Sequence, residues 1–488
     1  MILAIDQGTT STRALRVDDH GQIEITRVIK HQQYYPQPGW VEHDPEELIT
    51  NIEACIEASL ETEIAAIDAI GIDNQGESCL AWHADTKKAI CPVIVWQDNR
   101  SEAQIEKLKR DHHEARVLEI AGLPLDAYFS ASKLAWIIEH CADAKLLLKQ
   151  GKLRLGTTDA FFLDRLADRF VTDITTASRT SLLNLQTGNW DQELCDLFKV
   201  PIEALPQIVP TTGDLGTVKV PGHISPGRQI PVTASVVDQQ ASLYGHGCRK
   251  NGDCKITFGT GAFALMVTGN ELVRSPEQGL LPTVAWQLDG SPCEYALDGG
   301  VYCAGSAINW GRDIGLFENY ADINQFEKPP AIERELVFVP ALSGLACPHW
   351  DRRAAGVWIG MSLDTDKSDL AQSILEGVAL RASEVIQAMS EFSTVGDQIS
   401  IDGGVSVNPY FCQFLANALQ RRVSVKPMAE LTAIGTAQLA GANVINLPDN
   451  TASEKHYIPE ETGAEYKERF QRAINCTLNW RQSQATWD

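Results

Sequence analysis

The sequence lacks the short motifs that mark several common enzyme classes. Its 488 residues contain no CxxC pair for zinc or redox chemistry, no HExxH helix and no GxSxG turn. Its eleven histidines show no paired spacing typical of metal ligands. These absences argue against a zinc enzyme and against a serine hydrolase.

Basic residues are also scarce. Lys and Arg total 41 against 64 Asp and Glu, which gives a formal net charge of −23. Nucleic-acid binding draws its affinity from Lys and Arg, so nucleic acid is not expected as a partner. The same acidity repels phosphorylated ligands. A phosphate site must therefore be local, built from backbone donors and a metal ion.

Long hydrophobic segments are missing as well. No apolar run reaches the ~20 residues of a membrane-spanning helix, and the first residues, MILAIDQGTT, indicate a strand rather than a signal peptide. The twelve cysteines are scattered through apolar segments, as expected of buried free thiols in a reducing compartment. We therefore expect a cytoplasmic protein without membrane insertion.

The length predicts more than one domain, because single hydrophobic cores stop growing near roughly 250 to 300 residues. Hydrophobic residues make up 44% of the chain, enough for full-sized cores. A loop-rich segment, Val200–Ile230, approaches a boundary that we place near Gly245. The expected organisation is an N-terminal domain over 1–245, a C-terminal domain over 246–445 and a helical tail over 446–488.

Two segments share the pattern of strand, glycine turn and strand. Ile2–Val17 turns at Gly8, and Ile256–Val267 turns at Gly259 to Gly261. No helix pattern follows Gly8 directly, which separates the chain from Rossmann and P-loop proteins. Such a repeat is expected if two related domains each present a phosphate-facing hairpin to a shared cleft.

The first turn carries groups suited to phosphate and metal together. Asp6 ends a strand and can hold Mg²⁺ through water, because Mg²⁺ keeps several waters and takes few carboxylates. Amides and hydroxyls of the turn can receive phosphate oxygens. An ordinary hairpin turn would have the same composition, and the residues alone do not separate the two interpretations.

Asp238 is the candidate catalytic base. It follows a strand pattern, Ile230–Val237. An alcohol near pH 7 is a poor nucleophile, so a carboxylate that accepts its proton would assist attack on phosphorus. The competing interpretation is a structural carboxylate that caps the helix from Gln239 onward.

Two further blocks suit small-molecule binding. Glu77, Trp96 and Tyr128 supply the polar groups and flat walls of a polyol pocket, although the aromatics could equally be core residues and Glu77 a solvated turn residue. Within Ile401–Tyr410, Asp402 precedes two glycines that would let adenine or ribose approach the backbone. A tight strand-to-helix turn is the alternative for this block.

Taken in order, these blocks resemble the FGGY carbohydrate kinases, and within them the glycerol kinases, to about residue 445. Tyr128–His140 and Gly356–Glu376 resemble the two family signatures, and Tyr35–Pro45 and Thr175–Asn184 match further blocks. The resemblance implies an α/β fold of two actin-like ATPase (ribonuclease H-like) domains flanking a central cleft. It also implies ATP and Mg²⁺ as cofactors, and domain closure that excludes water.

The resemblance also assigns roles residue by residue. Asp238 corresponds to the base, and Asp6 to the residue that approaches the metal through water. The implied nucleotide-binding residues are Thr9, Thr10, Ser11, Arg13, Thr260, Gly305, Asn309, Gly404 and Asn408. The implied substrate-binding residues are Gly76, Glu77, Trp96, Tyr128, Asp238, Gln239 and Phe263.

One position departs from the family pattern. Glycerol kinases usually read Asn-Gln-Arg-Glu-Thr in the pocket loop, with the arginine on the substrate, whereas this chain has Gly76 in the arginine's place. We expect phosphorylation of a primary hydroxyl of glycerol or a similar small polyol, giving ADP, with a tetritol or pentulose as the alternative substrate. A nucleotide-switched actin-like binding protein is the alternative of a different class. Either kind of protein, the kinase or the binding protein, could assemble as a homo-oligomer.

Overall fold

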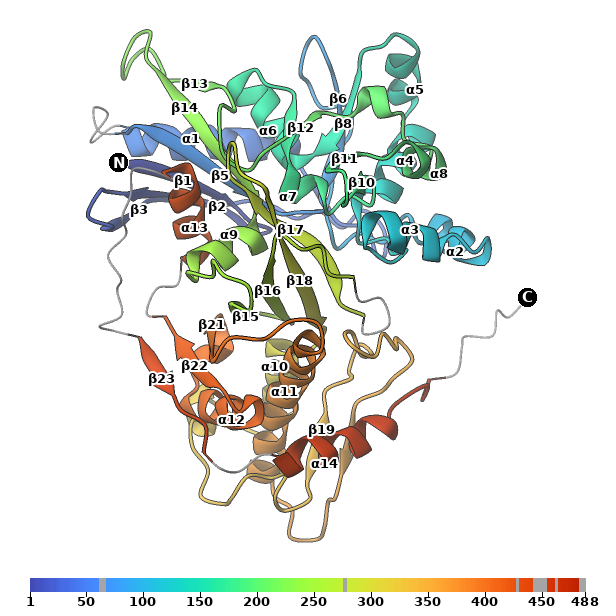
Figure 1. Ribbon diagram of the computed structural model, residues 1–488, viewed down its shortest axis with the longest axis vertical. Coiled ribbons are helices and arrows are strands. Elements are labelled where there is room, and N and C mark those ends of the chain that lie inside the picture. The colour runs from blue at the N-terminus through green and yellow to red at the C-terminus, as the bar shows by residue number, and fades with distance from the viewer. Residues whose placement is uncertain (61–66, 275–278, 427–429, 442–453, 461–463, 482–488) are drawn as a thin grey trace.

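The computed structural model describes residues 1–60, 67–274, 279–426, 430–441, 454–460 and 464–481. Two large sheets organise it, the upper one in Figure 1 built from the first half of the chain and the lower one from the second. The α-helices are α1 Pro45–Leu60, α2 Glu102–Arg110, α3 Glu114–Ala121, α4 Ser130–His140, α5 Ala142–Lys149, α6 Thr158–Ala167, α7 Ile174–Ala177, α8 Gln192–Phe198, α9 Asp238–Gly245, α10 Gly305–Asp313, α11 Lys367–Ser390, α12 Pro409–Leu419, α13 Leu431–Ala440 and α14 Ala464–Asn475.

The first sheet has six strands. Their order is β13 (Thr217–Lys219), β14 (Gln229–Val237), β5 (Ala69–Asn74), β1 (Ile2–Gln7), β2 (Ser11–Val17) and β3 (Ile23–Lys30). Side chains of a strand alternate between the two faces of its sheet. Leu3 and Ile5 accordingly pack against α1 and α6, while Ile2 and Ala4 pack against α13. Helices thus cover both faces, which explains the unbroken apolar run at the start of the chain.

The second sheet repeats the arrangement of the first. It has seven strands in the order β17 (Leu281–Gln287), β18 (Cys293–Val301), β16 (Ala262–Gly269), β15 (Cys254–Phe258), β21 (Gln398–Asp402), β22 (Arg422–Val425) and β23 (Lys455–Tyr457). In both sheets three antiparallel neighbours (β1, β2, β3 and β15, β16, β18) are followed in the chain by two strands parallel to the first of them (β5, β14 and β21, β22). The two predicted hairpins are therefore equivalent parts of two similar sheets.

Shorter strands complete the described part of the chain. A four-stranded sheet has the order β4 (Glu42–His43), β7 (Val93–Ile94), β6 (Cys79–His83) and β8 (Leu153–Thr157). Two-stranded sheets pair β10 (Leu183–Asn184) with β11 (Asn189–Trp190), β12 (Gln207–Val209) with β9 (Val171–Asp173), and β19 (Val337–Val339) with β20 (Val357–Ile359).

One helix of the second half returns to the first half. Helix α13, drawn in red beside β1 and β2 in the upper part of Figure 1, packs against β1, β5 and α9. Its neighbour Glu430 forms an ion pair of 2.5 Å with Arg13. The sequence predicted a C-terminal domain over 246–445 and did not predict that α13 packs on the first half of the chain. The apolar residues of α13 do not indicate which sheet they cover. Residue 445 itself lies outside the described residues.

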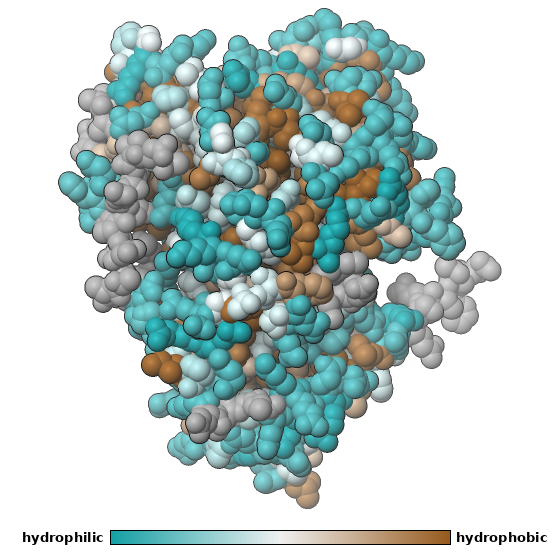
Figure 2. All heavy atoms as spheres, viewed as in Figure 1, coloured by the Kyte–Doolittle hydropathy of each residue, from teal (hydrophilic) through white to brown (hydrophobic). Residues whose placement is uncertain are grey.

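The tail contains the expected helix and an additional strand. Helix α14 buries Tyr466, Phe470 and Ile474 in the core of the second half. Strand β23, which the sequence reasoning did not include, extends the second sheet at β22. In the described ranges no helix is long and apolar enough to cross a membrane. Figure 2 shows a largely hydrophilic face, as the many charged residues predict.

Candidate active site

Two cavities contain most of the predicted functional residues. The smaller, of about 80 Å³, is lined from both halves of the chain and is called the polyol cavity below. The larger, of about 410 Å³, lies in the second half and is called the nucleotide cavity. The polyol cavity is lined by Thr9, Gln75, Gly76, Glu77, Trp96, Tyr128, Arg179, Val237, Asp238, Gln239, Gln240, Phe263, Leu265 and Asp298. All seven predicted substrate-binding residues are among them.

Asp238 is the first residue of α9, at the end of the buried strand β14. Its Oδ1 accepts a hydrogen bond of 2.6 Å from the backbone amide of Gln239. This bond reaches only the next residue and does not cap α9, whose N-cap is Val237, so the capping interpretation is wrong. The carboxyl group lines the polyol cavity. Burial, aided by the charge of Glu77, raises the pKa of Asp238 to about 7. A carboxyl group with this pKa can exchange a proton near neutral pH.

Glu77 is held by a buried arginine. The Nε of Arg179 donates a hydrogen bond of 2.7 Å to Glu77 Oε1, and Nη1 lies 3.2 Å from Asp298 Oδ2. Burial lowers the pKa of the guanidinium, but the charges of Glu77 and Asp298 outweigh it and the net shift is upward. The cavity wall thus contains a carboxylate, a fixed cation and a second carboxylate drawn from three separate segments.

Gln239 is oriented by Lys255 on β15. The Lys255 Nζ donates hydrogen bonds to Gln239 Oε1 at 2.8 Å and to Thr257 Oγ1 at 2.9 Å. An ammonium group can only donate, so the contact fixes the carboxamide oxygen of Gln239 toward Lys255. The amide NH₂ of Gln239 is left to donate into the cavity.

The aromatic wall is held by a buried lysine. The rings of Trp96 and Tyr128 meet edge to face with centroids 5.6 Å apart. Lys133 on α4 is fully buried, and its Nζ donates to the backbone carbonyls of Tyr128 and Trp96. Trp96 Nε1 in turn donates to Thr9 Oγ1 at 3.1 Å. One lysine thus positions both aromatics and, through Trp96, the hydroxyl of the first turn.

Only one of the four phosphate-binding residues predicted in the first turn lines a described cavity. Thr9 lines the polyol cavity, whereas Thr10, Ser11 and Arg13 line neither described cavity, and Arg13 is paired with Glu430. The turn is closed by a hydrogen bond of 3.1 Å from the Gly8 amide to the Ser11 carbonyl. Any phosphate contact by these three residues would therefore be made outside the two cavities.

Asp6 has an acidic neighbour that the sequence reasoning missed. Asp6 on β1 pairs in register with Asp73 on β5, and Thr436 Oγ1 donates to Asp73 Oδ2 at 2.7 Å. Burial raises the pKa of both carboxyl groups, and the charge of Asp6 adds to the effect on Asp73. Asp73 Oδ1 is buried without a hydrogen-bond donor. A shared proton or a cation would relieve the repulsion between the two carboxylates.

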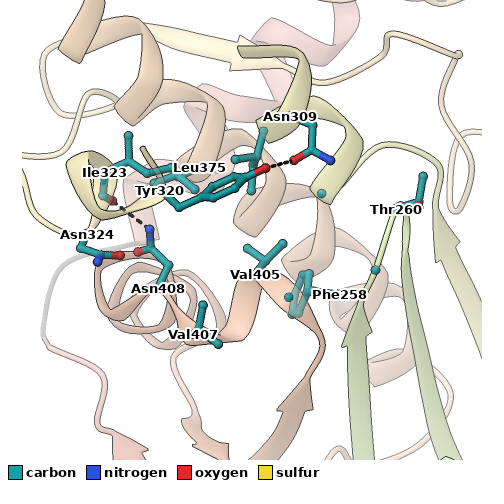
Figure 3. A pocket seen from close by; sticks show the side chains of 14 residues that line it. Phe258, Thr260, Asn309, Tyr320, Ile323, Asn324, Leu375, Val405, Val407 and Asn408 are labelled. Carbon is teal, nitrogen blue, oxygen red and sulfur yellow. Dashed lines mark hydrogen bonds between the residues drawn. The ribbon is translucent and has the colours of Figure 1, made fainter. Parts of the chain in front are cut away.

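The nucleotide cavity contains all five residues predicted for it in the second half. Thr260, Gly305, Asn309, Gly404 and Asn408 line it (Figure 3). Asn408 also has a structural role, because its Oδ1 caps α12 at the Phe411 amide and its Nδ2 donates to the Ile323 carbonyl. Its carboxamide keeps a second N–H and a second oxygen lone pair, so its predicted contact with the nucleotide stays a prediction.

Tyr320 is a wall of the nucleotide cavity that was not predicted. Its hydroxyl donates to Asn309 Oδ1 at 2.6 Å (Figure 3). The same hydroxyl accepts a hydrogen bond from Arg312 Nη1 at 2.8 Å. These bonds hold the half-exposed ring beside the cavity. The segment around Tyr320 carries no glycine turn or strand pattern, so sequence alone offered no signal for it.

Gly76 has little empty space beside it. A Cβ at this position would lie 3.3 Å from Val237 Cγ1 and 3.8 Å from Arg179 Cγ. Its φ is not among the positive values found in the chain. The room expected from the loss of an arginine side chain is therefore partly filled by these two residues.

Comparisons with known proteins find similarity to carbohydrate kinases over nearly the whole chain. The N-terminal and C-terminal domain models of the FGGY family of carbohydrate kinases match residues 1–245 and 254–444. Glycerol kinase of Haloferax volcanii is 37% identical over 501 residues, and that of Alkalilimnicola ehrlichii 38% over 493, each covering 98% of both chains. The crystal structure of Plasmodium falciparum glycerol kinase with ADP aligns with a TM-score of 0.91 at 28% identity, covering 98% of both chains. The predicted fold class, two actin-like ATPase (ribonuclease H-like) domains, is confirmed.

Proposed function

The chain belongs to the FGGY family of carbohydrate kinases, and we propose that it transfers the γ-phosphoryl group of ATP to a primary hydroxyl of glycerol. The products would be ADP and the phosphate ester. The curated relatives named above, similar over nearly their whole length, support glycerol as the acceptor. The observation that carries the proposal is Asp238, a carboxyl group with a pKa of about 7 in a small polar cavity between the two halves.

The described contacts support a role for each side of the polyol cavity. Asp238 would accept the proton of the attacking hydroxyl as the bond to phosphorus forms. Glu77 would accept a hydrogen bond from another hydroxyl, since Arg179 fixes its position. Gln239 would donate its amide N–H, since Lys255 holds its oxygen. Trp96 and Tyr128 would cover the carbon chain and exclude water.

Mg²⁺ is a proposed partner of the reaction. Asp6, with Asp73 beside it, offers hard carboxylate oxygens and a buried oxygen without a donor, a set that fits this ion. Asp6 would hold the ion through water. When bound, Mg²⁺ neutralises charge on the transferred phosphoryl group.

The geometry around Gly76 favours glycerol over a longer polyol. At the position where a side chain would begin, Val237 lies closer than an ordinary van der Waals contact, and Arg179 lies at ordinary contact distance. The polyol cavity is small, at about 80 Å³. A four- or five-carbon substrate would have to displace these neighbours, so we rank a tetritol or pentulose second.

The cysteines support a reducing compartment, and hence the proposed cytoplasmic location. All twelve lie in the described part of the chain without forming a disulfide, and eight of them are buried.

A substrate panel tests the proposed function. Wild-type protein with ATP and Mg²⁺ would be assayed for ADP release with glycerol, erythritol, xylitol, dihydroxyacetone and xylulose. We expect the highest kcat/KM for glycerol. A higher kcat/KM for erythritol or xylulose than for glycerol would mean that a longer polyol or ketose is the substrate. If the protein bound nucleotide but released no ADP in the presence of any of these alcohols, the alternative of a nucleotide-switched binding protein would be favoured.

A further inference from the structure

Arg179 is a buried guanidinium that faces the polyol cavity from a segment outside the predicted pocket. It follows α7, and its side chain is only 7% exposed. It lines the cavity together with Gly76, Glu77 and Asp238. Its planar fork presents several N–H groups in fixed directions, which suits recognition of neighbouring oxygens.

The contacts of Arg179 leave Nη1 without a hydrogen bond. Nε donates to Glu77 Oε1 at 2.7 Å. Nη1 forms an ion pair with Asp298 at 3.2 Å, but it is buried and has no hydrogen-bond partner in the described protein. The ion pair offsets the charge, but a buried N–H group without a hydrogen bond is costly, and such groups are rare in folded proteins unless a ligand or water completes them. An acceptor from outside the protein is therefore expected at Nη1.

Gly76 keeps this nitrogen beside the cavity. A Cβ at residue 76 would come within 3.8 Å of Arg179 Cγ, so a long side chain there would share the same space. With glycine at this position, Arg179 is the guanidinium that adjoins Glu77 and the cavity. In the glycerol kinase pattern described above, an arginine at this loop position contacts the substrate.

We propose that Arg179 binds a non-reacting hydroxyl of the polyol through Nη1, and so takes over the role of the missing loop arginine. This inference rests on the proposed function. It makes Arg179 a specificity-determining residue rather than only a support for Glu77. The oxygen of the hydroxyl accepts the bond, and its hydrogen remains free for Glu77 or Asp298.

The test compares substrates that differ by one hydroxyl. Arg179→Lys keeps the positive charge between Glu77 and Asp298 but removes the fork, and Arg179→Met is the more severe variant. Each would be assayed with glycerol, 1,2-propanediol and 1,3-propanediol. Arg165→Lys is the matched control, because Arg165 pairs with Glu46 outside the cavity. Circular dichroism and the KM for ATP would show that the fold and the nucleotide cavity are retained.

We expect Arg179→Lys to lower kcat/KM for glycerol about 10- to 100-fold, the usual effect of losing a hydrogen bond to a charged group. For the diol that lacks the bound hydroxyl, the same variant should change kcat/KM by less than about threefold. An equal loss with all three substrates would mean that Arg179 only positions Glu77, and would overturn the inference. Unchanged kinetics would overturn it as well. If wild-type protein did not phosphorylate glycerol, the proposed function itself would be refuted.

Discussion

Asp238 determines how the reaction should depend on pH. Burial, with the charge of Glu77, raises its pKa to about 7. A base works only when it is deprotonated, so kcat/KM for glycerol should fall as the pH drops below about 7 and level off above it. Steady-state kinetics of wild-type protein across that range would check this. A profile that stays flat through pH 7 would contradict Asp238 as the base.

Asp238 should also weaken the fold above neutral pH. Its pKa is raised in the folded state, so the folded protein binds the proton more tightly than the unfolded chain, and stability is lost as the pH rises toward about 7. Asp238→Asn removes this cost. We expect the variant to lose about 10²- to 10⁴-fold in kcat, yet to be more stable than wild type by at least about 1 kcal/mol at pH 8.

Thermal unfolding at pH 8 and pH 4 would measure the effect. The gain should shrink at pH 4, where both states approach the protonated form. Asp85→Asn is the control, because Asp85 is exposed and Lys152 lowers its pKa. If the variant were less stable than wild type at pH 8, other contacts in the folded protein would have to offset the cost of burying the charged Asp238 carboxylate.

Lys133 should affect substrate binding without touching substrate. It holds the carbonyls of Trp96 and Tyr128, whose rings line the polyol cavity. Lys133→Met keeps the apolar stem and removes the donor. We expect KM for glycerol to rise about tenfold or more, as for loss of a charged hydrogen bond, with KM for ATP unchanged. Lys145→Met on exposed α5 is the control, and equal rises in both KM values would argue against this role.

At the scale of residues, sequence reasoning found groups that sit in recognisable local patterns. Asp238, Gln239 and Glu77 follow strands, and the structure brings them to one cavity. It missed Arg179, Lys133 and Lys255, because their partners are distant in the chain and neither spacing nor composition indicates such contacts. It assigned Asn408 to the nucleotide but not to the cap of α12, which that side chain also forms.

At the scale of elements, α9 and α13 pack unusually closely through glycine. A Cβ on Gly435 would lie 1.9 Å from the Ala241 carbonyl oxygen of α9. An alanine normally stabilises a helix by about 1 kcal/mol relative to glycine. Here the clash should reverse the sign, and we expect Gly435→Ala to destabilise the protein by about 1 to 3 kcal/mol.

The melting temperature of Gly435→Ala would be compared with that of Gly222→Ala. A Cβ on Gly222 meets nothing within 4 Å, so this control should be nearly neutral. A melting temperature of Gly435→Ala at or above that of wild type would mean that α9 and α13 can separate without loss.

The elements themselves were largely predictable. The hairpins at both glycine turns and the helix Pro45–Leu60 follow from local periodicity and turn residues, and the structure contains them. The return of α13 to the first sheet and the pairing of β23 with β22 were not predicted. Both depend on which distant surface a short segment covers, and a segment's own residues do not specify that.

At the scale of the whole molecule, two similar sheets each bring a hairpin turn to a cavity: Thr9 lines the polyol cavity, and Gly259 and Thr260 line the nucleotide cavity. The polyol cavity takes Thr9 and Asp238 from the first half and Phe263 and Asp298 from the second. Contacts between the halves, such as the ion pair of Arg352 with Asp126 at 2.9 Å, lie outside this cavity. The reaction site therefore exists only when both halves are in place, as a transfer that excludes water requires.

The most direct test of the account is the stoichiometry of the products. Wild-type protein would be incubated with ATP, Mg²⁺ and glycerol, and ³¹P NMR would follow ADP and the phosphate ester together, with Asp238→Asn as the control. The account predicts one glycerol phosphate for each ADP, no ADP without glycerol, and almost no product from the variant. ADP and inorganic phosphate without an ester would contradict the central claim that this cavity directs the phosphoryl group to an alcohol.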